Sequence, residues 1–405
     1  MKPIVRAGRM KPVHSDIRGP LFVEAMKRQK QGIDILKLNT GNPATFGFGL
    51  PDSIKNALME HMQDGVGYCD FKGMPQARQA ICDYETSKDI KGITSDDVFI
   101  GNGVSEVVSF ALTPLLNDGD EVLVPSPSYS LWGNSVYLED GKPVFYTCDE
   151  QANWYPDIQD IRSKITDKTK AIVIINPNNP TGVLYPKEIL LEIIQIAREF
   201  GLLIFADEIY DRLVMDGKQH ISLASLTEDV PVITLNGLSK SHCLCGYRCG
   251  WMVISGPREL TEDYRQGIIQ LTSLRLCANT MAQIVIPAAL DDMDTPASMV
   301  RPGGRIYEQR EATVRELEKI NGLSFVKNDA AFYVFPKLDV KKFNITNDKQ
   351  FAHDLLDATN ILLVPGSGFD WKDPDHFRIV MLPQADILSD AIRRMGTFLD
   401  GYKQK

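Results

Sequence analysis

The chain has 405 residues, 43% of them hydrophobic and 24% charged, which is the composition of a folded protein long enough for two domains. Its formal net charge of −9 argues against a nucleic-acid partner, because neutralising phosphates requires a concentrated basic face. No stretch approaches the ~18 consecutive apolar residues of a membrane span and the first residues lack the apolar core of a secretory signal, so we expect a cytoplasmic protein without a membrane partner.

Short apolar runs between about residues 95 and 255 predict the strands of one sheet. The runs are DVFIG, DEVLVP, KAIVIINP, GLLIFADE, PVITLNG and CGWMVIS. Most are continuously apolar, as expected for parallel strands covered on both faces, and amphipathic segments separate them in a βαβ pattern. One such segment, 185–201, predicts a crossover helix that ends at Gly201. The residues of its apolar stripe are Ile189, Ile193, Ile194, Ala197 and Phe200.

The C-terminal part predicts a second, smaller α/β unit. Residues 257–292 are largely helical in pattern, and the Pro- and Gly-interrupted stretch 291–304 predicts a connection. A charged amphipathic helix is expected to begin near Arg305, and another near 348–359. Apolar runs and a terminal helix complete this unit.

Polar residues follow the apolar runs, at the carboxyl edge of the sheet where ligands of open α/β proteins gather. Gly103, Val104 and Ser105 connect the first run to a helix for which we expect Ser105 as N-cap. Backbone N–H groups at such a helix start bind phosphate well. The alternative is a glycine that serves only the geometry of the turn.

Three more strand ends supply candidate ligand-binding residues. Tyr129 could stack on a planar ligand or simply begin a core helix. Asn179 lies in a turn made rigid by prolines and Gly182, with an ordinary Asx turn as the alternative. Asp207 directly follows a buried strand and needs a cationic partner there, and Tyr210 would share its face if a helical turn follows.

The stretch 235–251 places Lys240 and Arg248 among glycine, serine and cysteine rather than on a charged surface. A lysine removed from water loses proton affinity and becomes nucleophilic, as a lysine that condenses with an aldehyde requires. Pyridoxal 5′-phosphate is such an aldehyde, and its phosphate, ring and ring nitrogen would find Arg248, Tyr129 and Asp207. The residues therefore predict this cofactor.

Cysteines in the same stretch raise the alternative of a metal site. Cys243, Cys245 and Cys249 do not form a C-x-x-C pair, and no histidine or fourth cysteine follows at zinc-like spacing. We therefore expect small packing residues and no metal. The seven cysteines of the whole chain are interpreted as free thiols of a reducing compartment.

Four motifs resemble those of the class I aminotransferases of PLP fold type I over nearly the whole chain. They are NNPTG (178–182), DEIY (207–210), SK followed by GYRCGW (239–251) and FRIVML (377–382). SDIRGPLFVEA and LNTGNP near the N-terminus further resemble alanine transaminases, closest to the bacterial glutamate-pyruvate type. The resemblance implies a large domain (48–300) with a mainly parallel seven-stranded sheet. Residues 1–47 and 301–405 would form the smaller α/β domain.

The resemblance also implies roles around the cofactor. Lys240 matches the Schiff-base lysine, and Asp207 the carboxylate that keeps the pyridine nitrogen protonated. Tyr210 and Asn179 match the groups bonded to the ring hydroxyl, and Asn179 would also reach the substrate carboxylate.

For the substrate, Arg378 matches the arginine that grips the α-carboxylate through a bidentate pair, and Gly41 matches a backbone contact on a mobile N-terminal segment. Tyr68 matches a tyrosine that reaches the phosphate of the neighbouring subunit, which implies a homodimer with shared active sites. Arg18 is a candidate for a distal carboxylate, with a surface arginine as the alternative.

Two positions depart from the pattern of the family. The phosphate-binding serine of many relatives is Gly237 here, and Ser239 is the candidate replacement. The usual glycine pair before the aromatic Phe332 is Ala330 and Ala331, which puts the packing of that strand in doubt.

The expected reaction moves an amino group from L-alanine to 2-oxoglutarate, giving pyruvate and L-glutamate. Aminotransferases for other amino acids and a β-elimination lyase remain alternatives. A nicotinamide dehydrogenase is disfavoured because Glu106 replaces the third glycine of G-x-G-x-x-G and Glu121 opens its strand rather than closing it. A PLP-binding regulator is disfavoured because no basic helix-turn-helix segment precedes residue 40.

Overall fold

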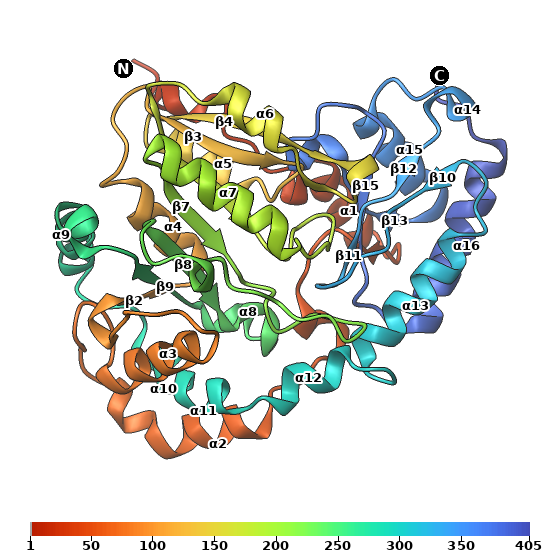
Figure 1. Cartoon of the computed structure of the whole chain (residues 1–405). Coiled ribbons are helices and arrows are strands. Elements are labelled where there is room, and N and C mark those ends of the chain that lie inside the picture. The colour runs from red at the N-terminus through yellow and green to blue at the C-terminus, as the bar shows by residue number, and fades with distance from the viewer. Residues whose placement is uncertain (1) are drawn as a thin grey trace.

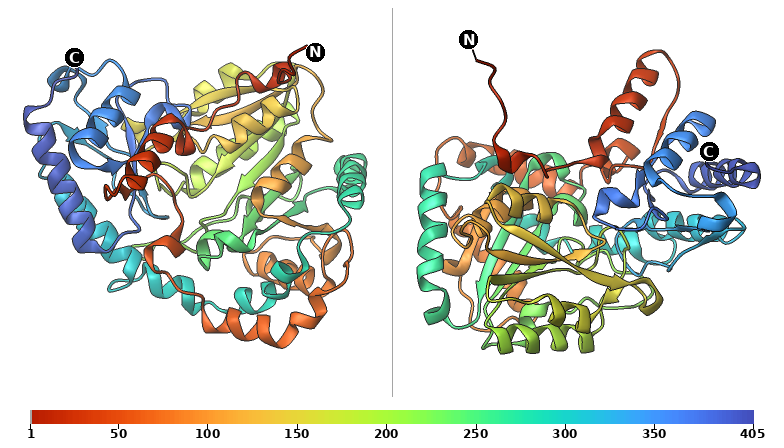
Figure 2. Two further views of the ribbon diagram at one scale, coloured as in Figure 1. Left: turned by 180° about the vertical axis from the view of Figure 1, so that it is seen from behind. Right: turned by 90° about the horizontal axis from the view of Figure 1, so that it is seen from above.

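A computed structural model describes residues 2–405. A large twisted sheet with helices on both faces lies beside a second group of helices and short strands (Figure 1). Helix α1 (Pro20–Lys30) comes from the N-terminal part of the chain but lies against the C-terminal part, as both views in Figure 2 show. The two ends of the chain therefore contribute to one unit.

The central sheet has the strand order β2-β9-β8-β7-β6-β3-β4-β5. Its strands are β2 (Val98–Asn102), β3 (Glu121–Ser126), β4 (Lys142–Asp149), β5 (Tyr155–Pro156), β6 (Thr169–Ile175), β7 (Leu203–Asp207), β8 (Val232–Gly237) and β9 (Cys249–Ser255). The five neighbours from β8 to β4 pair in parallel, whereas β9 is antiparallel to β2 and β8. The sheet is mainly parallel, as predicted.

The sheet has eight strands rather than the predicted seven. The additional strand, β5, has two residues and pairs antiparallel with the end of β4. Strand β4 itself is absent from the apolar runs of the sequence because exposed and half-buried residues interrupt its buried positions. A strand near the sheet edge loses the continuous apolar signal that central strands carry.

Both faces of the sheet are covered, which explains the unbroken apolar runs. Ile172 and Ile174 of β6 face the cluster that contains α7 (Lys187–Phe200), while Val173 faces the cluster of α4 (Val104–Leu112) and α5 (Leu131–Leu138). Because successive side chains of a strand point to opposite faces, all positions of β6 from Ala171 to Ile175 are buried.

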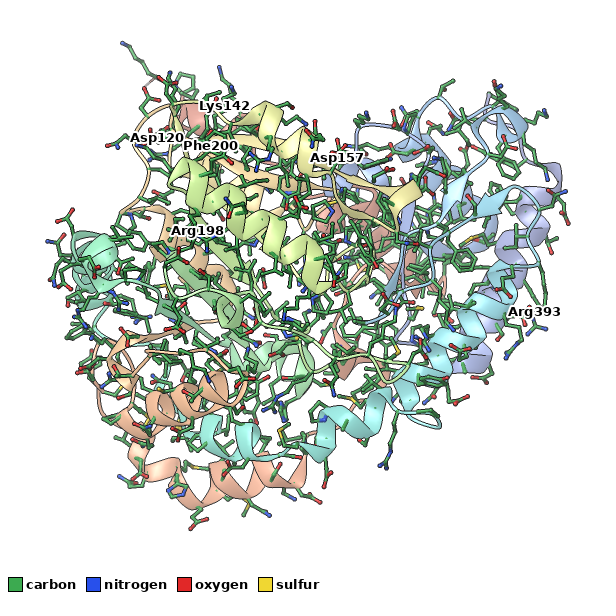
Figure 3. All side chains as sticks on the ribbon, viewed as in Figure 1. Asp120, Lys142, Asp157, Arg198, Phe200 and Arg393 are labelled. Atoms are coloured by element: carbon green, nitrogen blue, oxygen red, sulfur yellow. The ribbon has the colours of Figure 1, made fainter. Side chains whose placement is uncertain are left out.

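Helix α7 matches the predicted crossover helix, and Gly201 ends it in the left-handed conformation at φ 67°. Ile193, Ile194 and Ala197 are buried as predicted. The prediction is wrong for Phe200, which is 43% exposed at the C-terminal end of the helix (Figure 3).

The large unit has eight further α-helices among the described residues. They are α2 (Asp52–His61), α3 (Pro75–Ser87), α6 (Ile158–Lys164), α8 (Leu238–Ser241), α9 (Arg258–Arg275), α10 (Thr280–Ile284), α11 (Ile286–Asp291) and α12 (Asp294–Val300). The predicted connection 291–304 is wrong in its middle, which forms α12. Pro296 is tolerated there because it lies in the first turn of the helix, where N–H groups have no intrahelical acceptor.

The C-terminal part forms the expected smaller α/β unit. Its elements are α13 (Arg305–Leu317), β10 (Leu323–Ser324), β11 (Tyr333–Val334), β12 (Lys337–Leu338), α14 (Val340–Phe343), α15 (Asp348–Thr359), β13 (Ile361–Leu362), β14 (Val364–Pro365), β15 (Phe377–Val380) and α16 (Ala385–Gly401). Strand β1 (Leu36–Lys37) pairs in parallel with β13 and so joins the N-terminal segment to this unit. The two predicted helices near Arg305 and 348–359 are confirmed.

Within residues 2–405, no single helix is long and apolar enough to cross a membrane, although the bent pair Arg258–Arg275 and Thr280–Asp291 passes that test of length and composition together.

Gly182 joins the loop after β6 to the C-terminal part, since its carbonyl accepts hydrogen bonds from the N–H groups of Asp329 and Ala330. Its φ is +69°, and a Cβ there would lie 2.6 Å from the Cβ of Asn328. We expect Gly182→Ala to lower the free energy of unfolding by about 2–4 kcal/mol, because a left-handed conformation and a steric clash add.

Gly201→Ala is the matched control, because Gly201 has φ +67° and no heavy atom within 4 Å of the added carbon. This control should cost only about 1–2 kcal/mol. Urea unfolding of both variants checks the difference, and equal losses would contradict it.

Candidate active site

Residues predicted from separate motifs meet at the carboxyl edge of the sheet. Tyr129 follows β3, Asn179 follows β6, Asp207 ends β7, and Lys240 lies on α8 directly after β8 (Figure 1). Parallel strands bring their carboxyl ends to one edge, so residues up to 111 positions apart in sequence become neighbours.

The Lys240 ammonium lies in a nearly enclosed position. Its Nζ donates a hydrogen bond to the carbonyl of Gly41 (3.0 Å) and lies 4.0 Å from Sγ of Cys245. It also lies 5.9 Å from the centre of the Phe332 ring. Among residues 2–405, no carboxylate oxygen comes within 4.0 Å of this ammonium.

The proton affinity of Lys240 differs from the prediction. Burial acts to lower its pKa, but the ionisable side chains of Tyr333, Cys245 and Tyr129 act to raise it, and the net shift is upward. Burial therefore acts in the expected direction, but the neighbouring side chains outweigh it, and the expected net loss of proton affinity is wrong. A ligand that binds this nitrogen must displace the proton.

Asp207 is 5% exposed and has one strong donor. The indole N–H of Trp132 on α5 donates to its Oδ2 (3.0 Å), and the N–H of Ile209 lies 3.4 Å from its Oδ1. Burial raises the pKa of Asp207 to about 6 in spite of these hydrogen bonds. No lysine, arginine or histidine nitrogen of residues 2–405 lies within 4.0 Å of this carboxylate, so the cationic partner expected from the sequence does not come from the described chain.

Two tyrosines face each other beside this carboxylate. The hydroxyls of Tyr210 and Tyr333 are 2.9 Å apart, and the ring of Phe332 packs edge-on against Tyr210. Burial raises the pKa of Tyr210 well above its ordinary value, so its hydroxyl stays protonated at neutral pH. Tyr333 and Trp132 were not predicted from the sequence. Their contacts with Tyr210 and Asp207 depend on the direction in which each side chain points, which an apolar pattern does not specify.

The doubtful alanine pair packs normally. Ala330 donates its N–H to Gly182, and Ala331 donates to the carbonyl of Leu213 (2.8 Å). Ala331 adopts φ 58°, a left-handed conformation that costs roughly 1–2 kcal/mol for a residue with a Cβ. The strand that carries Tyr333 is therefore formed at a small conformational cost.

Arg378 on β15 is buried without an acidic partner. Its Nη1 donates to Oδ1 of Asn179 (2.9 Å) and its Nη2 to the carbonyl of Asn39, while its Nε has no hydrogen-bond partner among residues 2–405. The guanidinium lies 4.6 Å from the ring centres of both Tyr333 and Phe369. Burying an unpaired charge is costly, so this arrangement is typical of a site for an anion.

The stretch 103–105, predicted to bind phosphate, differs from the prediction in its helix cap. Helix α4 begins at Val104 and its N-cap is Gly103 rather than Ser105, because the backbone there has φ 86° and ψ 163°, which side chains rarely allow. A Cβ on Gly103 would lie 2.3 Å from Nη2 of Arg248. That same Nη2 donates to Oγ of Ser105 (3.2 Å), so the guanidinium of Arg248 lies beside the N-terminus of α4 and adds its positive charge there.

The structure gives a physical reason for Gly237. A Cβ at this position would lie 2.6 Å from the carbonyl oxygen of Cys249 on the neighbouring strand. Ser239 is half-buried, and its hydroxyl makes no hydrogen bond within the described chain. The position three residues before Lys240 therefore has no room for a serine in this arrangement.

Arg18 and Tyr68 are not brought into this cluster within the single chain. Arg18 is exposed on a short 3-10 helix (Asp16–Arg18), although the neighbouring carbonyl of Ile17 accepts a hydrogen bond from Asn39 Nδ2 (2.8 Å). Tyr68 is 83% exposed. Both remain predictions.

The cluster fits pyridoxal 5′-phosphate. Lys240, Arg248 and Arg378 are cations without an acidic partner among residues 2–405, and Asp207 is a carboxylate without a cationic one. A ligand with a phosphate, an aldehyde and a protonated ring nitrogen complements these charges. Of the three cysteines near Lys240, Cys249 is buried on β9, and Cys243 and Cys245 are half-buried.

The sequence model of the family "Aminotransferase class I and II" matches residues 33–392. The chain is 49% identical to "Glutamate-pyruvate aminotransferase AlaA" of Haemophilus influenzae over 404 residues, covering 100% of both proteins. It is 45% identical to "Alanine aminotransferase" of Mycobacterium tuberculosis, covering 94% of that protein. Among solved structures, an aminotransferase from Escherichia coli superposes with a TM-score of 0.98 at 46% identity, covering 100% of both chains.

The raised pKa of Asp207 predicts a pH-dependent stability. The unfolded carboxyl ionises near its ordinary pKa of 3.8, whereas the folded one keeps its proton up to about 6. A proton held more tightly by the folded state stabilises it fully below pH 3.8, and this contribution is lost as the pH rises to 6, by up to about 3 kcal/mol.

Asp207→Asn, in protein prepared without cofactor, should therefore match the parent at about pH 4 and exceed its unfolding free energy at pH 7, as measured by urea unfolding. Asp229→Asn is the control of opposite sign, because Arg198 holds the pKa of Asp229 below its usual value. A difference for Asp207→Asn that does not change with pH would contradict the burial argument.

Proposed function

The chain belongs to the class I and II aminotransferase family, and we propose that it transfers an amino group between L-alanine and 2-oxoglutarate, giving pyruvate and L-glutamate. The main support for a substrate with a carboxylate is the guanidinium of Arg378, which is buried without an acidic partner among residues 2–405. Relatives at 45–49% identity over the whole chain, named glutamate-pyruvate or alanine aminotransferases, support the choice of substrates.

The cofactor of this enzyme is pyridoxal 5′-phosphate. When bound, it supplies an aldehyde that takes up the amino group and a ring that withdraws electrons from the α-carbon. Asp207 would accept a hydrogen bond from the protonated ring nitrogen, and the Tyr210 hydroxyl and Asn179 amide would bond the ring oxygen. Tyr129, half-exposed at the sheet edge, would stack on the ring.

We assign phosphate binding to the N-terminal end of α4. The backbone of Gly103, Val104 and Ser105 would contribute N–H groups, the Ser105 side chain a hydroxyl, and Arg248 a guanidinium. Ser239, one residue before Lys240, has a free hydroxyl within the described chain and is the candidate for the remaining phosphate contact.

Proton transfer is assigned to Lys240. Its amine would take the α-proton of the bound amino acid, acting as base, and would then return the proton to the cofactor carbon, acting as acid. The carbonyl of Gly41, 3.0 Å from Nζ, holds the protonated form in place. Arg378 would bind the α-carboxylate through a bidentate pair, with Asn179 and Gly41 beside it.

The distal carboxylate of glutamate needs a further cation. Arg18 is exposed, without an ion pair among residues 2–405, and follows Ile17, which contacts Asn39 next to Arg378. We assign this role to Arg18 when the N-terminal segment covers the substrate. An aminotransferase for other amino acids and a β-elimination lyase are the competing assignments.

The exposed surface near Tyr68 supports a homodimer with shared active sites. The segment 65–69 is fixed to α10 by Thr280 Oγ1, which donates to the carbonyl of Gly65 (2.6 Å), yet its apolar side chains are exposed. Val66 and Tyr68 are 75% and 83% exposed, and Leu276 nearby is 52% exposed. Covering these side chains by a second copy would bring Tyr68 to the phosphate of the partner.

We also propose that the domains divide at residues 48–300 against 1–47 with 301–405. In support, one apolar cluster draws only on 1–47 and 301–405, and another draws only on 48–300. Seven free cysteines support a cytoplasmic location.

The substrate assignment predicts rapid amino transfer from alanine. Mixing the cofactor-loaded enzyme with L-alanine should convert the bound pyridoxal absorbance to that of pyridoxamine phosphate in a single turnover and release pyruvate. Aspartate, methionine and cystathionine should react at least tenfold more slowly, a discrimination of about 1.4 kcal/mol.

Lys240→Ala is the control, and its turnover should fall by at least ~100-fold, because the residue that moves the proton is lost. No conversion with alanine would remove the substrate assignment, and release of ammonia in place of amino transfer would favour the lyase.

Shared active sites predict that two inactive variants restore each other. Tyr68→Ala and Lys240→Ala homodimers should each be impaired. In a hybrid dimer, one site combines the intact Lys240 of one subunit with the intact Tyr68 of the other. Reassociating an equal mixture should restore about a quarter of the sites, because half of the dimers are hybrids with one intact site each. Activity that stays at the sum of the two variants would contradict a shared site.

A further inference from the structure

The loop that carries Asp207 and Tyr210 has a second face that the proposed reaction does not use. Its other two acidic residues, Glu208 and Asp211, each directly follow one of the cofactor-contacting residues and are buried at 2% and 7% exposure. Both carboxylates converge on one ammonium, that of Lys88 at the C-terminal end of α3. We propose that Lys88 is a positioning residue, which fixes Asp207 and Tyr210 against the cofactor by tethering the carboxylates that alternate with them.

Lys88 is the centre of a buried ionic cluster. Its Nζ lies 3.0 Å from Glu208 Oε2, 3.3 Å from Asp211 Oδ2 and 2.6 Å from Glu85 Oε2. The side chain of Lys88 is 14% exposed and that of Glu85 is 0% exposed. Three buried carboxylates around one ammonium are stable only if short ion pairs and further hydrogen bonds offset the cost of removing the charges from water.

Each carboxylate of this cluster also binds an element of the active site or of the sheet beneath it. Glu208 Oε1 accepts from Ser222 Oγ (2.8 Å) and the N–H of Leu223 (3.1 Å), which fixes the segment after the loop. Asp211 Oδ2 accepts from Asn236 Nδ2 (2.7 Å), four residues before Lys240.

The third carboxylate extends the cluster to β9. Glu85 Oε1 accepts from the indole N–H of Trp251 (3.2 Å), three residues after Arg248. Strands β7, β8 and β9, next to whose ends Asp207, Lys240 and Arg248 lie, are therefore joined through a single ammonium.

The charges of the cluster make Lys88 hard to replace. Its neighbouring cation, Arg212, donates to the carbonyls of Ala289 and Leu290 and stacks over the ring of Tyr84, so it does not contact the three carboxylates. Tyr84 donates its hydroxyl to Asp211 (2.6 Å) but supplies no charge. Burial raises the pKa of Glu85 to about 7 even with Lys88 beside it.

A metal ion is not needed to explain the acidic groups. Glu208, Asp211 and His220 could together approach an ion, but the ammonium of Lys88 already lies within hydrogen-bond distance of Glu208 and close to Asp211. Without this ammonium, the carboxylates would repel one another and move apart or take up protons, and the loop between Asp207 and Tyr210 would lose its fixed geometry.

The inference rests on the proposed function, because it assumes that Asp207 and Tyr210 contact the cofactor. The test is the affinity of the full-length enzyme loaded with pyridoxamine 5′-phosphate, measured by equilibrium dialysis. This ligand has no covalent bond to Lys240, so its retention reports on contacts such as those of Asp207 and Tyr210. Lys88→Met should raise its dissociation constant by about tenfold, the loss typical when a group that orients ligand-contacting residues is removed.

Lys88→Arg keeps the charge and should return the dissociation constant to within about threefold of the parent. Arg265→Met is the matched control, because it breaks the buried ion pair with Asp97 (2.6 Å), away from the loop 207–211. It should lower the midpoint of thermal unfolding but leave the dissociation constant unchanged. If Lys88→Met does not fold, the double variant Lys88→Met with Glu85→Gln removes one of the uncompensated carboxylates. Its dissociation constant for pyridoxamine 5′-phosphate should still be higher than that of the parent.

Unchanged retention in Lys88→Met or in the double variant would overturn the inference, as would a loss in Lys88→Arg as large as in Lys88→Met. A parent enzyme that fails to retain pyridoxamine phosphate at all would instead overturn the proposed site.

Discussion

A guanidinium that is 1% exposed and has no acidic partner within the described chain is the constraint on which the site depends. Such a charge is rare inside a folded protein. The free-energy cost of removing it from water exceeds the gain from its hydrogen bonds to the neutral oxygens of Asn179 and Asn39. The position of Arg378 is therefore typical of a site for an anion. Lys240 has the same requirement, and Asp207 has the opposite one.

The sheet satisfies these requirements by bringing strand ends together. The parallel strands β3, β6, β7 and β8 each deliver one residue to the carboxyl edge, and the second unit adds Arg378 and Tyr333. Two close backbone approaches make this possible. Gly103 leaves space for Arg248, and Gly182 accepts the backbone of residues 329 and 330. A side chain at either glycine would separate groups that the chemistry needs in contact.

The loop after β7 shows how one short segment serves two purposes. Asp207 and Tyr210 face the site, while Glu208 and Asp211 face the ammonium of Lys88. The cost of burying three carboxylates is offset by one lysine and by donors from Ser222, Asn236 and Trp251. Rigid support of this kind keeps ligand-contacting groups within a fraction of an ångström of their productive positions.

The amino-acid sequence by itself determined the mainly parallel sheet and the polar residues that gather at its carboxyl edge, because continuous apolar runs and the polar residues that follow them are local signals. It did not reveal β4, whose partial exposure interrupts the apolar pattern, or α12, whose proline suggested a break. The roles of Trp132, Tyr333 and Lys88 were decided only by the tertiary structure. Their partners lie 75, 123 and 120 residues away, and no local pattern specifies which distant side chain a buried donor will meet.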